Sequence, residues 1–181
     1  MDLKSIDELT EHKDYILSAP KDESSISLLC VRPEEGERVF PESVDFSVAR
    51  GAIGDNWERG TWLTLDDGSP SPDVQVSILP KRIFDLVCEG AIHPGDTVIA
   101  DLDLSEKNLP IGQQLKLGEA IVEVGPEPNY GCDTWAHRYG NDALRFVAKK
   151  DHQPYRLRGV LCKIVKDGKV SVGDTISLTR S

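Results

Sequence analysis

The C-terminal residues 156–180 read RLRGVLCKIVKDGKVSVGDTISLTR. An apolar run, GVLCKIV, leads into the segment KDGK, whose Asp-Gly pair is typical of a tight turn. The segment VSVGDTISL after that turn is again rich in apolar residues. We therefore predict a strand, a turn and a last strand at this end of the chain. Short strands joined by tight turns favour a small β-barrel.

The same kind of pattern recurs through most of the chain. It predicts strands at residues 25–33, 38–51, 74–80 and 96–104, and a strand pair or one long bent strand at 112–125. Helical spacing appears at residues 2–17, 81–90 and 133–149, the last broken or kinked near Gly140. The predicted fold class is mainly β with a few helices, arranged as a closed or nearly closed β-barrel. We expect one structural domain, in which residues 1–43 form an N-terminal helix and a first strand packed on a barrel of residues 44–181.

Two segments of the chain echo each other. Residues 90–98 and 168–176 both fit the pattern G-x-[IV]-x-x-G-D-T-[VI]. We interpret the echo as a recurrent turn that enters a strand, not as a duplicated domain. Asp96 and Asp174 are accordingly predicted to bond local backbone amides, and neither is assigned a catalytic role.

The charge of the chain excludes some classes of partner. The 181 residues carry a formal net charge of −10, with a sequence pI of about 4.8. A chain this acidic repels phosphate backbones and anionic membrane surfaces, so we expect neither nucleic acid nor a membrane as partner. The N-terminus has no apolar signal segment, and no run approaches the roughly 20 apolar residues of a membrane span. These features predict a cytoplasmic protein.

Four cysteines are present, and one of them stands apart. Cys30, Cys88 and Cys162 have apolar neighbours, which is typical of small buried side chains. Cys132 instead lies in the segment PNYGCDTWAHRYG, among aromatic and basic residues. None of the four has the spacing of a zinc ligand. Cys132 is therefore either a free thiol in a surface turn or a functional one, as a reactive thiol or a thiolate ligand.

A basic segment surrounds Cys132 in the sequence. Residues 132–166 contain eight Lys or Arg, three Asp and no Glu, a net charge of +5 that leaves −15 for the rest of the chain. Such a patch on an acidic protein is a candidate site for a small anion, and nearby cations would lower the pKa of a thiol. His137 is a candidate catalytic base or cationic neighbour of Cys132. A cysteine hydrolase built on this pair ranks last, because the spacing is poor and no oxyanion-hole signature is present.

Three stretches together resemble the MOSC domain, the family named for the C-terminal part of molybdenum cofactor sulfurases. They are GAIGDNWERGTW at residues 51–62, PNYGCDTWAHRYGNDALRFV at 128–147, and YRLRGVLCKIVKDGKVSVGDTI at 155–176. Residues 98–124 are similar to the barrel middle of stand-alone bacterial members, so the resemblance covers roughly residues 44–180. It implies a barrel of the pyruvate-kinase type.

The resemblance also implies a chemistry. Cys132 matches the family cysteine, which serves either as a persulfide sulfur carrier or as a molybdenum ligand. The implied cofactor is the molybdenum cofactor (molybdopterin), and a redox partner would accompany the molybdenum use. These residues include no aminotransferase-like domain, so pyridoxal phosphate is not expected. The candidate cofactor-binding residues, taken from the family motifs and the basic segment, are Gly54, Asp55, Arg59, Arg138, Arg145, Arg156 and Arg158.

The predicted function is a MOSC-type module that handles molybdenum cofactor or sulfur through Cys132. Its partners would be a small anionic cofactor or a sulfur donor protein. Whether the module is an enzyme, as an oxidoreductase or a sulfur transferase, is left open by the sequence. The alternative is a non-catalytic regulatory or partner-binding barrel in which Cys132 is incidental.

Overall fold

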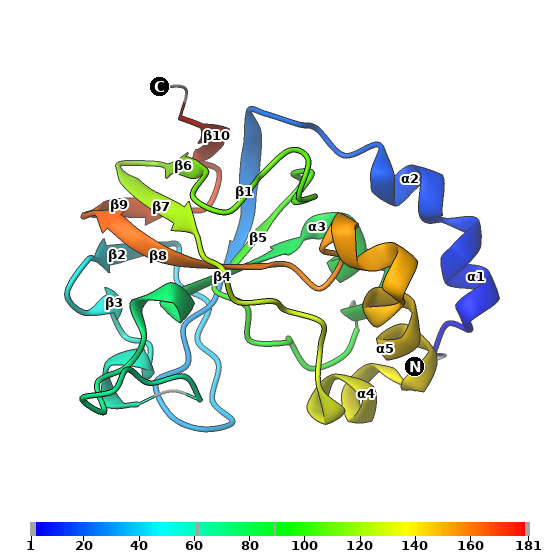
Figure 1. Cartoon of the computed structure of the whole chain (residues 1–181), viewed down its shortest axis with the longest axis horizontal. Coiled ribbons are helices and arrows are strands. Elements are labelled where there is room, and N and C mark those ends of the chain that lie inside the picture. Colours follow the sequence, from blue (N-terminus) through cyan, green and yellow to red (C-terminus); the bar gives the residue numbers. More distant parts are fainter. Residues whose placement is uncertain (1–2, 61, 89, 180–181) are drawn as a thin grey trace.

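The computed structural model describes residues 3–60, 62–88 and 90–179 (Figure 1). Seven of the described strands close into a barrel in the order β1-β10-β6-β7-β8-β4-β5, and β5 pairs with β1. The predicted fold class, mainly β with a closed barrel, is confirmed. The barrel strands are β1 (Ser24–Leu29), β4 (Val76–Pro80), β5 (Val98–Ala100), β6 (Gln114–Leu117), β7 (Ala120–Val124), β8 (Val160–Lys166) and β10 (Thr175–Leu178).

The first strand is part of the barrel itself. β1 pairs antiparallel with β10 on one side and with β5 on the other. Residues before position 44 therefore supply one of the seven barrel strands. The sequence analysis instead expected residues 1–43 to form a helix and a first strand packed on the outside of the barrel. Hydrophobic patterning finds a strand but does not tell which partners it has, because β1 and β10 are separated by almost the whole chain.

A small sheet flanks the barrel. It has three strands in the order β3-β2-β9, namely β2 (Ser43–Ser47), β3 (Gly51–Ala52) and β9 (Gly168–Ser171). The segment expected as one last strand forms both β9 and β10, because a turn redirects the chain from the small sheet into the barrel. Asp174 closes that turn by accepting a hydrogen bond from the Ser171 backbone N–H at 2.7 Å, as its predicted role requires.

The helices gather on one side of the barrel, at the right of Figure 1. The helix expected at residues 2–17 is divided at His12 into α1 and α2, and Gly140 separates α4 from α5 as predicted. The helical elements are α1 (Ile6–Glu11), α2 (Lys13–Leu17), α3 (Lys81–Ile83), α4 (Asp133–Tyr139) and α5 (Asn141–Ala148), the π-helical turn η3 (Phe84–Cys88), and the 3-10 turns η1 (Trp57–Arg59), η2 (Pro72–Val74) and η4 (Lys150–Tyr155). None of the helices in the described part of the chain is long and apolar enough to cross a membrane.

Two hydrophobic cores meet at β4 and β5. Ile78 and Val98 point into the barrel, whereas the next residues, Leu79 and Ile99, point outward to the core beneath the helices. All four side chains are buried, and each contributes roughly 1.5–3 kcal/mol by leaving water. Because successive side chains alternate between the faces, these strands join the helical layer firmly to the barrel. The segments that enter β5 and β8 carry the residues of the candidate site.

Candidate functional site

A cleft of about 500 Å³ opens beside Cys132. It lies where the loop before α4 meets the segments that enter β5 and β8. Its lining residues are Arg32, Trp62, Ser77, Pro94, Gly95, Asp96, Pro128, Asn129, Tyr130, Gly131, Cys132, Arg158 and Leu161. The structure thus brings Cys132 and Arg158, two residues singled out from the sequence, into one cleft.

Cys132 is exposed at the point where the loop turns into α4. The preceding Gly131 has φ +87°, and a Cβ added there would lie 2.8 Å from the Leu144 Cδ1 atom. A larger residue would therefore strain the backbone and displace the end of the Leu144 side chain of α5. This tight bend holds the thiol at the edge of the cleft.

The other three thiols are buried. Burial raises the pKa of Cys30 to about 11 and the pKa of Cys88 and Cys162 to about 12. Desolvation disfavours the thiolate, and at neutral pH these side chains stay protonated and out of reach of solvent. Cys132 is therefore the cysteine that a molecule in solution can reach.

Arg158 lines the cleft and is largely buried. Its Nη1 lies 2.9 Å from both carboxylate oxygens of Asp96, and its guanidinium carbon lies 4.4 Å from the centre of the Trp135 ring. Asp96 therefore makes a buried ion pair with a residue 62 positions away, and the prediction that it bonds local backbone amides is wrong. The repeated motif does not distinguish the two residues. Asp174 accepts a hydrogen bond from a backbone N–H in a turn, whereas Asp96 pairs with a guanidinium.

Close packing of the backbone fixes the position of Arg158. The next residue, Gly159, has φ +97°, and a Cβ there would lie 2.2 Å from the Ile78 carbonyl oxygen of β4. Glycine lets the start of β8 press against β4. The Asn129 side-chain amide also donates to the Arg158 carbonyl at 3.2 Å, which ties the cysteine loop to the same point.

Arg32 is a cleft residue that the sequence did not reveal. Its Nε and Nη2 lie 2.9 and 3.1 Å from the two oxygens of Asp55. Asp55 also accepts from the backbone N–H groups of Arg32 and Trp57, and its side chain is buried. Asp55 thus positions Arg32, and Arg32 lines the cleft. No motif surrounds Arg32, which simply follows the end of a buried strand.

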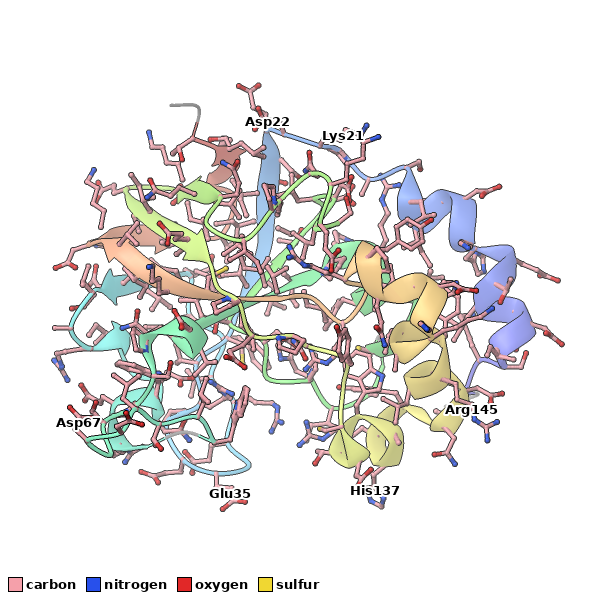
Figure 2. All side chains as sticks on the ribbon, in the orientation of Figure 1. Lys21, Asp22, Glu35, Asp67, His137 and Arg145 are labelled. Carbon is pink, nitrogen blue, oxygen red and sulfur yellow. The ribbon has the colours of Figure 1, made fainter. Side chains whose placement is uncertain are left out.

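Several predicted site residues lie outside the cleft lining. Gly54 sits in the exposed turn before Asp55, and Arg59 pairs with Glu34 at 2.7 Å on the surface. Figure 2 shows Arg145 and His137 pointing outward from their helices. Arg145 is 3.6 Å from Asp142, and no hydrogen bond joins His137 to Cys132 among the residues described. The role of these residues stays a prediction.

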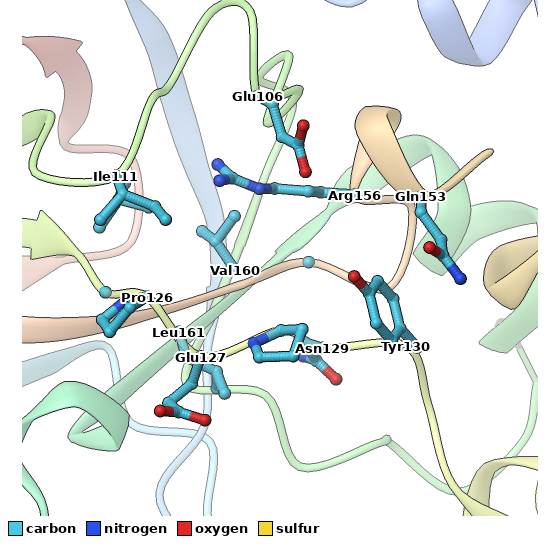
Figure 3. A pocket seen from close by; sticks show the side chains of 14 residues that line it. Glu106, Ile111, Pro126, Glu127, Asn129, Tyr130, Gln153, Arg156, Val160 and Leu161 are labelled. Atoms are coloured by element: carbon cyan, nitrogen blue, oxygen red, sulfur yellow. The ribbon is translucent and has the colours of Figure 1, made fainter. Parts of the chain in front are cut away.

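Arg138 and Arg156 lie close to the cleft but face other features. Arg138 donates from Nη1 to the Pro94 carbonyl at 3.2 Å, so it braces the turn that lines the cleft. Arg156 lines a separate pocket of about 100 Å³, where it lies near Glu106 with Tyr130 on the opposite side (Figure 3). Tyr130 lines both pockets, which makes the cysteine loop their common wall.

The donor set of the cleft limits the kind of metal it could take. Among the residues that the structure describes, no group of three or more His, Cys, Asp or Glu side chains could hold a metal ion. A bare ion would find one sulfur ligand at Cys132 and little else. A metal already held by an organic chelator would need fewer protein ligands than a bare ion.

Comparison with known proteins agrees with the fold. The family model of the MOSC domain matches residues 97–177. The YUAD protein from Bacillus subtilis is similar in structure, with a TM-score of 0.60 and 17% identity over 86% of this chain and 95% of that one. YiiM from Escherichia coli gives a TM-score of 0.56 and 18% identity over 87% of this chain and 70% of that one. No curated protein matches by sequence. At these identities the solved structures establish the shared fold.

Proposed function

We propose that this chain, whose residues 97–177 match the family model of the MOSC domain, binds an anionic, chelated metal cofactor of the molybdenum cofactor class through Cys132. One observation carries the proposal. The only exposed thiol of the chain's four cysteines lines a cleft that two guanidinium groups also line. A thiolate is the soft ligand that such a metal takes from a protein.

The size and the hydrogen-bond donors of the cleft support this ligand class. Its volume of about 500 Å³ falls in the usual range for small-molecule sites, roughly 300–1,000 Å³. Arg32 and Arg158 supply fixed N–H donors, and their pairing with Asp55 and Asp96 holds them in place. The cofactor would supply the redox chemistry. Cys132 would hold it, while the two arginines and the backbone around Gly95 would orient its anionic groups.

The exposure of Cys132 favours sulfur transfer as a second candidate function. The Cys132 thiolate would attack the outer sulfur of a donor persulfide, R–S–SH. The donor S–S bond breaks, R–S⁻ leaves, and Cys132–S–SH forms, so atoms and electrons balance without an added oxidant. The partner would be a sulfur donor protein, whereas cofactor use would call for a redox partner. A non-catalytic binding barrel is the remaining alternative.

The test is the molybdenum content per chain, measured by elemental mass spectrometry on protein made in a host that synthesises molybdenum cofactor. We expect near-stoichiometric molybdenum in the native chain and its loss in Cys132→Ala. Arg50→Ala is the matched control, because Arg50 is exposed, pairs with Glu58 and lies outside the cleft lining. It should keep the metal.

The intact mass of the same samples separates the alternatives. No molybdenum, but one added sulfur atom on Cys132, would replace cofactor binding by sulfur carriage. Neither metal nor added sulfur would overturn both candidates and leave the non-catalytic barrel. Molybdenum retained in Cys132→Ala would refute the assigned ligand.

A further inference from the structure

A second pocket, of about 520 Å³, lies on the other side of the turn at residues 93–96. Its walls are mostly apolar and come from β1, the turn η3 and the loop between β1 and β2. The residues that matter to its chemistry are Leu28, Arg38, Phe40, Phe84, Ile92 and His93. None of them lines the Cys132 cleft.

Three rings form one wall of this pocket. The His93 ring lies 5.2 Å from the Phe40 ring at 74° and 5.4 Å from the Phe84 ring at 50°, measured between ring centres. Phe40 and Ile92 are about half exposed, at 53% and 51%. Large apolar side chains left open around a hollow favour an apolar occupant, and edge-on rings favour an aromatic one.

Two arginine side chains contact the same turn, and neither forms an ion pair with a described carboxylate. Arg38 donates from Nε to the His93 carbonyl and from Nη1 to the Gly36 carbonyl, and Arg138 donates to the Pro94 carbonyl. In the described part of the chain, no Asp or Glu lies within ion-pair distance of either guanidinium. Partial burial and the charge of Arg138 lower the pKa of Arg38. The local charge is complementary to an anion.

His93 adds a donor of fixed direction. Its Nδ1 accepts from the Gly95 backbone N–H at 3.0 Å, which places the ring proton on Nε2. That Nε2 is buried and has no hydrogen-bond partner among the described residues. Burial lowers the pKa of His93 to about 4, so the ring is a neutral donor at neutral pH. A buried donor without a partner destabilises the empty pocket, and an acceptor on a ligand would offset that cost.

We propose that this pocket is a second ligand site, which binds a small aromatic carboxylate with its ring against Phe40 and Phe84 and its carboxylate at Arg38. The aromatic body would bury the open apolar walls. The carboxylate would meet the unpaired guanidinium in a charge-assisted hydrogen bond. The site does not depend on Cys132 or on any metal.

The two sites share one wall. A Cβ added at Gly95 would lie 3.2 Å from the Arg32 side chain, which lines the Cys132 cleft, and 3.6 Å from Arg38 Nη2, which lines the second pocket. Pro94, Gly95 and Asp96 face the cleft, while His93 faces the pocket. Occupants of the two sites would therefore be neighbours across a single turn.

The experiment is titration calorimetry of the full chain with 1-naphthoate and with the neutral 1-naphthamide, which has nearly the same shape. We expect naphthoate to bind the native chain more tightly than the amide, and Arg38→Ala to weaken naphthoate by about tenfold or more while changing the amide by less than about twofold. Phe40→Ala should weaken both probes. Arg50→Ala and Cys132→Ala serve as controls and should change neither, because neither residue lines this pocket.

Three results would overturn the proposal. Equal affinity for naphthoate and the amide, or equal losses of both in Arg38→Ala, would remove the role of the charge. Absence of binding by both probes would remove the site. Loss of naphthoate binding in Cys132→Ala, with naphthoate binding unchanged in Arg38→Ala, would show that naphthoate binds in the Cys132 cleft instead. The molybdenum measurement is independent of all three, so the two proposals can fail separately.

Discussion

Arg158 and Asp96 form an ion pair at 2.9 Å in which the side chains are only 14% and 2% exposed. The pair joins the segment that enters β8 to the segment that enters β5, and both of its residues line the same cleft as Cys132. Removing one partner would leave the other charge in a site that water hardly reaches. Such a change costs more than losing a surface pair.

Asp96→Asn should lower the free energy of unfolding by about 3 kcal/mol, because it leaves the Arg158 guanidinium without its carboxylate. Urea denaturation at neutral pH measures this loss. In the double variant Asp96→Asn/Arg158→Met, part of the stability should return, since neither charge is then buried alone. A loss below about 1 kcal/mol in the single variant would mean that solvent screens the pair.

Native Cys132 should react with a thiol reagent far faster than the other cysteines. It is exposed, whereas Cys30, Cys88 and Cys162 are buried with a raised pKa. A disulfide-exchange reagent should label one thiol per native chain and all four after unfolding. Labelling of the native chain should vanish in Cys132→Ala, and rapid labelling of a second cysteine would contradict the burial pattern.

Stability should fall between about pH 6.5 and pH 4 because of His93. Burial lowers its folded pKa from 6.5 to about 4, so the unfolded chain binds the proton more readily. The contribution of His93 to the free energy of unfolding is complete above pH 6.5. It is lost as the pH falls through the folded pKa, and the maximum loss is about 3 kcal/mol. Urea midpoints at pH 7 and pH 5 test this.

The matched variants for that test are His93→Asn and His137→Asn. His93→Asn should reduce the pH dependence of stability whatever its effect at pH 7, and part of the remainder would come from His152, whose pKa burial also lowers. His137 is exposed on α4, and its replacement should leave the native slope unchanged. If His137→Asn flattened the slope as much as His93→Asn, the buried ring would not be its source.

Gly159→Ala should destabilise the barrel by at least about 2 kcal/mol, because φ is +97° and the new Cβ would overlap the Ile78 carbonyl oxygen. Gly68→Ala is the matched control, since its φ is +83° and nothing lies within 4 Å of the added carbon. Its cost should be about 1 kcal/mol, that of backbone strain alone. Thermal melts of the two variants measure the two losses of stability. Equal losses would show that the backbone of β4 shifts enough to accommodate the added Cβ.

Local pattern predicted much of the fold. Alternation found β4, β5 and the β6–β7 pair, and glycine at position 140 predicted the break between α4 and α5. The strand order around the barrel escaped prediction, because β1 pairs with β10 through contacts that no local pattern encodes. Where one strand was expected at residues 38–51, the structure has β2 and the short β3, because Pro41 and the turn before Gly51 interrupt the segment.

The candidate site was predicted less well than the fold. The position of Cys132 beside Arg158 agrees with the grouping made from the sequence, but the basic segment does not form one patch. Helical and 3-10 turns rotate Arg145 and Arg156 to different surfaces. Arg32 and Asp96 reach the cleft through tertiary contacts, and a repeated motif gave Asp96 the wrong partner.

β4 and β5 are the one parallel pair among the described barrel strands. A hairpin cannot join parallel neighbours, so residues 81–97 must travel back along the barrel before β5 begins. That crossover carries Phe84, Ile92 and His93 of one pocket and Pro94, Gly95 and Asp96 of the other. Exchanging it for the equivalent stretch of another barrel of this fold would therefore replace part of both proposed ligand sites in one chimaera, with the antiparallel hairpins left untouched.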